Sequence, residues 1–91
     1  MCGIAGYVGK TPNPSECLAK MAQAINHRGP DNKGIWLDEK SDIGLAHARL
    51  SILDLSSAGN QPMQSSSKKY VIVFNGEIYN HNELRSELEL I

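Results

Sequence analysis

The feature that most restricts the fold of this chain is its first segment, residues 1–6, which read Met-Cys-Gly-Ile-Ala-Gly. Removal of Met1 makes Cys2 the first residue, which then carries a thiol and a free α-amine on one backbone unit. The amine titrates at about 7.7–8.0 and the thiol at about 8.5, so the amine can assist deprotonation of the thiol near neutral pH. A strand is expected over residues 2–9. Its first residue is either a covalent nucleophile or, as for most free cysteines, a small apolar side chain in the core.

Length and composition indicate one small soluble domain. The 91 residues are 41% hydrophobic and 5% aromatic, which allows a modest core without layers of large rings. A formal net charge of −1 argues against a nucleic acid partner or an anionic membrane surface. Two cysteines make no disulfide framework, no leader segment opens the chain, and no apolar run approaches the ~20 residues of a membrane span. The expected location is the cytoplasm.

The front half of the chain predicts a helix and two strands after the first strand. Residues 16–26 carry apolar side chains at helical spacing behind the start signal Ser15-Glu16, and Pro30 ends the helical region. Strands are expected over 34–37 and 43–48, joined by a polar turn. The apolar positions of the helix are Leu18, Met21, Ala22 and Ile25.

The back half predicts one strand and one helix after a long polar segment. A short apolar run at 51–55 precedes the serine-rich segment 56–67, and 70–74 is the clearest candidate for a core strand. Asn80 and Glu83 have the spacing of a capping box, so a helix is expected from there to the last residue. No closing strand follows. The layer is therefore expected to leave apolar surface without cover, and the chain looks incomplete.

Two further sites could carry chemistry. Asn75-Gly76 follows the expected strand 70–74, where a side-chain amide and a backbone N–H could together stabilise an oxyanion, although Asn-Gly is also the commonest tight-turn dipeptide. Arg49 stands at the exit of strand 43–48, where its guanidinium could hold a carboxylate or simply lie in solvent. No metal site is expected, because His27, His47 and His81 share no ligand spacing and the chain contains no Cys-x-x-Cys pair.

Five segments of the chain match one family in order. They are Met-Cys-Gly-Ile-Ala-Gly at 1–6, His-Arg-Gly-Pro-Asp at 27–31, His-Ala-Arg-Leu-Ser-Ile-Leu-Asp-Leu at 47–55, Gln-Pro-Met at 61–63 and Phe-Asn-Gly-Glu-Ile-Tyr-Asn at 74–80. With these segments the chain resembles the glutaminase domain of glutamine-hydrolysing asparagine synthetases, a class II glutamine amidotransferase of the N-terminal-nucleophile fold. The resemblance implies an α+β fold, a four-layer αββα sandwich, of which residues 1–91 form the N-terminal part and which is incomplete at its C-terminal side.

The resemblance also implies a role for individual residues. Cys2 attacks the side-chain amide of glutamine with its own α-amine as base, releases ammonia and leaves a glutamyl thioester that water cleaves. Asn75 and Gly76 form the oxyanion hole, and Arg49 binds the glutamine α-carboxylate. The remaining pocket residues are Leu50, Ser51, Ile52, Leu53 and Glu77, and the turn at the mouth of the site is made by Arg28, Gly29, Pro30 and Asp31.

The resemblance further implies partners and cofactors that lie outside this chain. Ammonia passes to a C-terminal synthetase domain, in which ATP and Mg²⁺ activate aspartate, while the glutaminase part needs no cofactor of its own. The family also has a Gly-(Ser/Thr)-Asp-x-Glu segment, whose aspartate binds the glutamine α-ammonium, and the 91 residues contain no such segment. We therefore expect the chain to be the front of a longer enzyme and to be inactive alone.

Other interpretations remain open. Related enzymes with a similar front half amidate sugars or close β-lactam rings, so the acceptor is not fixed. The chain alone could be a catalytically silent folding unit that associates with itself to cover exposed sheet. Thiol redox chemistry with Cys17 is a third alternative, and attachment of Met1 would block the α-amine of Cys2.

Overall fold

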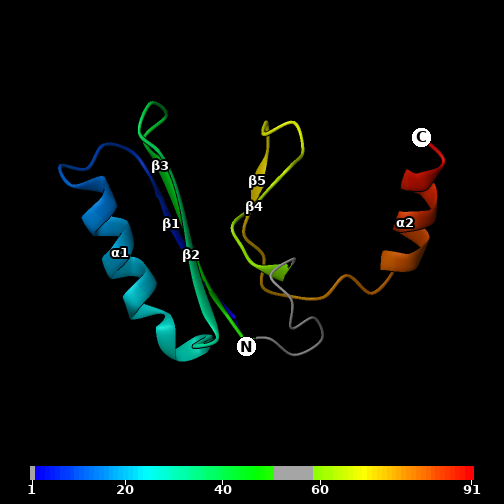
Figure 1. Cartoon of the computed structure of the whole chain (residues 1–91), viewed down its shortest axis with the longest axis horizontal. Helices are drawn as coiled ribbons and strands as arrows, with labels where there is room; N and C mark the ends of the chain where they lie inside the picture. The colour runs from blue at the N-terminus through cyan, green and yellow to red at the C-terminus, as the bar shows by residue number, and fades with distance from the viewer. Residues whose placement is uncertain (1, 51–58) are drawn as a thin grey trace.

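The chain forms a three-stranded sheet with a helix on one face and a second, smaller sheet and a helix on the other side (Figure 1). The computed structural model describes residues 2–50 and 59–91. Its element order mixes helices with antiparallel strands, so the described chain is a small α+β arrangement.

The large sheet contains β1 (Gly3–Val8), β2 (Asn32–Asp38) and β3 (Ile43–Arg49), in the order β1-β3-β2 with both pairings antiparallel. The three strands confirm the sequence predictions, and β2 is longer than expected because its residues pair with β3 along its whole length. In the register, Gly3 lies opposite Ala48 and Asn32 lies opposite Arg49. The start of β1 and the end of β3 therefore meet at one edge of the sheet.

The turn between β2 and β3 is fixed by a side chain at its first corner. Oδ1 of Asp38 accepts hydrogen bonds from the backbone amides of Lys40 (3.0 Å) and Ser41 (3.4 Å). Asp42 then takes a positive φ of 54°, a conformation that aspartate tolerates better than most residues. These contacts hold β2 and β3 in a single hairpin.

Helix α1 (Pro14–Ala24) covers one face of this sheet (Figure 1). It begins two residues before the predicted start because Pro14 occupies the first turn, where its missing N–H costs nothing and its fixed φ suits the helix. Leu18 and Ala22 are buried against Ala46 of β3, as the spacing predicts. The small alanine side chains let helix and sheet approach closely. A short 3₁₀ helix, η1 (Asn26–Arg28), follows α1.

The second sheet is smaller and more exposed than the sequence suggests. It pairs β4 (Met63–Gln64) with β5 (Val71–Ile72), so the predicted core strand 70–74 is wrong in length and in burial. Ile72 is 54% exposed, because no described element lies over it. The strand β4 falls inside the segment 56–67, for which the sequence predicted a long polar stretch and no strand.

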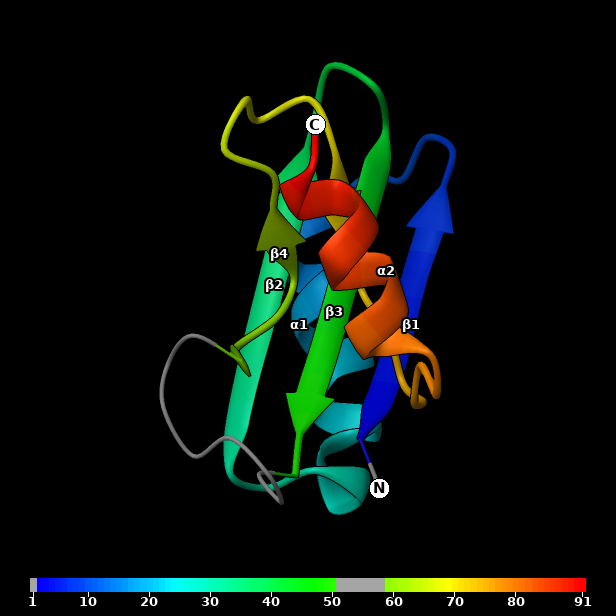
Figure 2. The ribbon, with the colours of Figure 1, turned by 90° about the vertical axis from the view of Figure 1, so that its right-hand side faces the viewer.

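Helix α2 (His81–Glu89) lies on the side of the large sheet away from α1 (Figures 1 and 2). The helix forms where it was predicted, but Asn80 makes no side-chain capping bond, so the capping box is wrong. None of its residues is buried, and Leu88 is 68% exposed. Among the described residues, no helix has the length and apolarity needed to cross a membrane.

Candidate active site

Cys2 lies at the edge of the sheet where β1 starts and β3 ends. Its side chain is half-buried, and its Sγ accepts a hydrogen bond from the backbone amide of Leu50 at 3.4 Å. The thiol also lies 3.8 Å from the carbonyl oxygen of Leu50, to which it can donate. The antiparallel pairing of β1 with β3 thus brings together two residues that are 48 positions apart.

The turn that follows η1 closes this edge. Nε of Arg28 donates to the carbonyl oxygen of Cys2 at 3.2 Å, and the backbone amide of Asp31 donates to the carbonyl of Arg49 at 3.0 Å. Pro30 forms an isolated bridge with Arg49, and Gly29 is buried where any Cβ would overlap the backbone carbonyl of Ala48. The Arg28–Asp31 turn therefore lies beside Cys2, and its role as the mouth of the site stays a prediction of the resemblance.

Arg49 is the last residue of β3 and is 7% exposed, so the alternative of a solvent-exposed arginine is wrong. Its Nη1 donates to Oδ1 of Asn60 at 2.7 Å, and its guanidinium lies against Gly59, where a side chain would collide with it. Arginine keeps its charge in proteins, and a buried charge is costly unless polar groups surround it. A guanidinium held in this way, one residue from Leu50, is suited to binding a carboxylate.

The predicted oxyanion residues are not assembled with Cys2. Asn75, Gly76 and Glu77 are exposed in the segment between β5 and α2, and no hydrogen bond joins them to Cys2 in the described part of the chain. Gly76 lies in a bend between β5 and α2, as the tight-turn alternative for the dipeptide allows, and this bend does not connect two paired strands. The predicted pocket residues Ser51, Ile52 and Leu53 lie outside the described residues.

His47 is a buried polar residue that the sequence did not single out. It is 1% exposed in the central strand, and neither ring nitrogen has a hydrogen-bond partner among the described residues. Burial holds the pKa of His47 below its ordinary value of 6.5; the backbone of Phe74 raises it in part, and the positive charge of Arg49 lowers it further. Burial therefore favours the uncharged form of the ring.

Two further polar residues support the site without having been predicted. Asn60 binds Arg49, and Oε1 of Gln61 accepts the backbone N–H of Phe74 at 2.6 Å. Gln61 belongs to one of the five matched segments, which could have drawn attention to it, whereas nothing in the local sequence marks Asn60.

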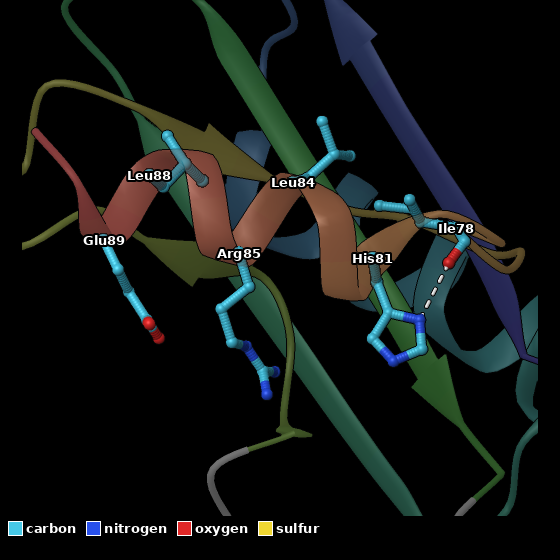
Figure 3. A pocket seen from close by; sticks show the side chains of 6 residues that line it. All are labelled: Ile78, His81, Leu84, Arg85, Leu88 and Glu89. Atoms are coloured by element: carbon cyan, nitrogen blue, oxygen red, sulfur yellow. Dashed lines mark hydrogen bonds between the residues drawn. The ribbon is translucent and has the colours of Figure 1, made fainter.

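A hollow beside α2 shares no residue with the neighbourhood of Cys2 (Figure 3). Figure 3 shows the apolar side chains at 78, 84 and 88 on one side of the helix and the polar ones on the other. The residues that line the hollow are Ile78, His81, Leu84, Arg85, Leu88 and Glu89. Neither here nor elsewhere in residues 2–50 and 59–91 do His, Cys, Asp and Glu side chains gather into a group that could hold a metal ion.

Comparison with known proteins identifies the class to which this arrangement belongs. The family model of the glutamine amidotransferase domain matches residues 1–90, so the chain belongs to that family. The resemblance noted from the five segments is thereby confirmed.

Individual relatives of this chain carry more specific names than the family does. It is 45% identical over 94 residues to the glutamine-hydrolysing asparagine synthetase 1 of Bacillus subtilis, a match covering 98% of the chain and 14% of that protein. The putative glutamine-hydrolysing asparagine synthetase 2 of Methanocaldococcus jannaschii is 42% identical over 108 residues, which covers 99% of the chain and 21% of that protein. The chain thus spans about a fifth or less of the length of these relatives. No solved structure gives a significant match.

Proposed function

We propose that this chain is the front part of the glutaminase half of a glutamine-dependent asparagine synthetase. The observation that carries the proposal is the thiol of Cys2, held at the exposed edge of the sheet by the amide of Leu50 and next to the buried Arg49. Membership of the glutamine amidotransferase family and the names of the relatives support the same reaction.

In the proposed reaction, the thiolate of Cys2 attacks the side-chain carbonyl carbon of glutamine. The α-amine of Cys2, freed by loss of Met1, takes the thiol proton and passes it to the departing nitrogen. A C–S bond forms, the C–N bond breaks, and ammonia leaves. Water then cleaves the thioester to give glutamate and restore the thiol. Arg49 would bind the α-carboxylate of the substrate through its guanidinium.

The oxyanion role of Asn75 and Gly76 requires a movement. Because both residues are exposed and unbonded to Cys2 in the described chain, their segment would have to close over the thiol when the site is complete. Glu77, together with residues 50–53, would then line the rest of the glutamine pocket.

The remaining parts of the enzyme follow from the length of the relatives. We propose that residues 1–91 contribute to a four-layer αββα sandwich, and that a further domain uses ATP and Mg²⁺ to activate aspartate for the ammonia. The large difference in length between this chain and its relatives supports such a division. On this proposal the chain alone hydrolyses no glutamine, since part of the substrate pocket would come from elsewhere.

The test is glutamine hydrolysis by the full-length gene product and its variants. Cys2→Ala should abolish glutamate formation, whereas Cys17→Ala, which alters the other cysteine, should leave it within about twofold of wild type. Intact mass shows whether Met1 has been removed. Continued hydrolysis of glutamine by the Cys2→Ala protein would refute the proposed function. Hydrolysis of glutamine by the 91-residue chain alone would refute the prediction that this chain is inactive by itself.

A further inference from the structure

His47 occupies the middle of a row of residues that crosses the large sheet. Its neighbours in the register are Ile4 on β1 and Gly34 on β2, all three on the face away from α1. This is the face over which the chain after residue 59 passes (Figure 2). The ring is therefore enclosed between the central strand and that later segment, which explains its 1% exposure.

Gly34 brings the later segment down onto the sheet beside this ring. A Cβ at Gly34 would overlap the backbone carbonyl of Gln61 and lie 3.1 Å from Cδ of Pro62. The absence of a side chain at this one position lets Gln61 lie directly on β2. From there its side chain accepts the backbone N–H of Phe74 at 2.6 Å. Phe74, the residue before Asn75, is thus held on its amide side.

The carbonyl side of Phe74 and the ring of His47 are each short of a partner. A neutral imidazole offers one N–H donor, and a buried donor without an acceptor is unfavourable. The hydrogen bonds of the described residues include none to the Phe74 carbonyl, although its amide is held by Gln61 on the face that carries the ring. The backbone of Phe74 and the charge of Arg49 both act on the pKa of His47.

We propose that His47 is a positioning residue for Asn75 and Gly76. One ring nitrogen, which has no partner within hydrogen-bond distance among the described residues, closes onto the backbone carbonyl of Phe74 in solution and donates a hydrogen bond to it. The contact fixes the peptide that leads directly into Asn75. With the amide of Phe74 held by Gln61 and its carbonyl by His47, the peptide before Asn75 has a fixed position relative to the central strand. That position in turn fixes where the oxyanion donors lie. The catalytic consequence rests on the proposed glutaminase function, but the contact itself does not.

The direct test is heteronuclear NMR on the 91-residue chain. We expect a scalar coupling across the hydrogen bond between a ring nitrogen of His47 and the carbonyl carbon of Phe74. This measurement uses the unaltered protein, so it decides the matter even when a variant fails to fold. Absence of the coupling, with both ring nitrogens showing the signature of solvent exchange, would overturn the proposal.

Matched variants separate positioning from packing. His47→Phe keeps a ring of similar size and removes the donor, whereas His47→Gln retains an N–H donor. The amide signals of Asn75 and Gly76 should move in His47→Phe and return towards their wild-type positions in His47→Gln. The control His27→Phe alters an exposed histidine and should leave both signals in place. Unmoved signals in His47→Phe would contradict the proposal.

Kinetics of the full-length gene product extend the test to the reaction. Because the contact places oxyanion donors and does not touch the substrate carboxylate, His47→Phe should lower kcat by about threefold to tenfold and leave the KM for glutamine within about twofold. His47→Gln should recover most of the loss. A larger change in KM than in kcat would count against positioning. A wild-type protein without glutaminase activity would refute the proposed function, while the NMR coupling would still decide the contact.

Discussion

Replacement of Leu18 by alanine tests whether the core between α1 and the sheet carries the stability of this chain. Leu18 is completely buried, and the residues packed around it include Ala22 and Ala46, whose methyl groups cannot reach into a vacated volume. Replacement of a leucine buried in this way by alanine typically lowers the free energy of unfolding by about 2–5 kcal/mol. A chain of this size has a free energy of unfolding of roughly 5–14 kcal/mol, at about 0.05–0.15 kcal/mol per residue. The variant should therefore lose a large fraction of the total.

The matched control is Leu88→Ala on α2. Leu88 is 68% exposed, so its truncation should change the free energy of unfolding by no more than about 0.5 kcal/mol. The measurement is urea unfolding followed by the fluorescence of Trp36, with thermal melts as a second probe. Leu18→Ala should lower Tm by about 8–40 °C, on the scale of about 4–8 °C per kcal/mol for small domains.

Equal losses in the two leucine variants would refute the reasoning. That result would mean that α2 is buried in solution to the same extent as α1, for example by association of two copies. A dependence of Tm on protein concentration, removed by Leu88→Ala, would identify such an association.

Three other predictions follow from single contacts. Because burial holds the pKa of His47 below 6.5, the unfolded chain binds a proton at this residue more readily than the folded chain does. The free energy of unfolding should therefore be highest above pH 6.5 and fall below it, with a slope of at most about 1.4 kcal/mol per pH unit. Urea unfolding at a series of pH values measures this slope, and His47→Gln should remove it. Gly34→Ala should destabilise the chain by about 1–3 kcal/mol and speed hydrogen exchange at the Phe74 amide, because the new Cβ displaces Gln61; unchanged exchange would contradict this. Asp38→Ala should cost about 1 kcal/mol in thermal unfolding through loss of the turn contacts, whereas Asp38→Asn, which keeps an acceptor, should cost less; equal losses would contradict the assignment.

Much of the front half could be predicted because its pattern is local. The spacing of Leu18, Met21 and Ala22 gives both the helix and the face that it buries, and the strands on either side of the turn at Asp38 follow from alternation and polar residues. Arg49 could be placed at the end of a strand for the same reason. What no local pattern gives is the register, which places Cys2 against Leu50.

The back half was harder because an apolar run shows which residues can be buried, not whether anything covers them. Residues 70–74 have the composition of a core strand, yet Tyr70 is 74% exposed, since no described element packs over it. The burial of His47 escaped prediction for the opposite reason. A histidine in a strand is polar by composition, and only the neighbouring Gly34 and the later chain reveal that it is enclosed.

The order β1-β3-β2 has a consequence for the time during which the ribosome synthesises the chain. Gly3 pairs with Ala48, which emerges from the ribosome 45 residues later. At about 5–20 residues per second, that interval lasts about 2–9 s. On the proposed function, in which loss of Met1 frees the α-amine of Cys2, this segment has no β3 to pair with during that interval and stays accessible to the enzymes that remove an initiator methionine. The head of the chain is therefore available for maturation before the fold can enclose it.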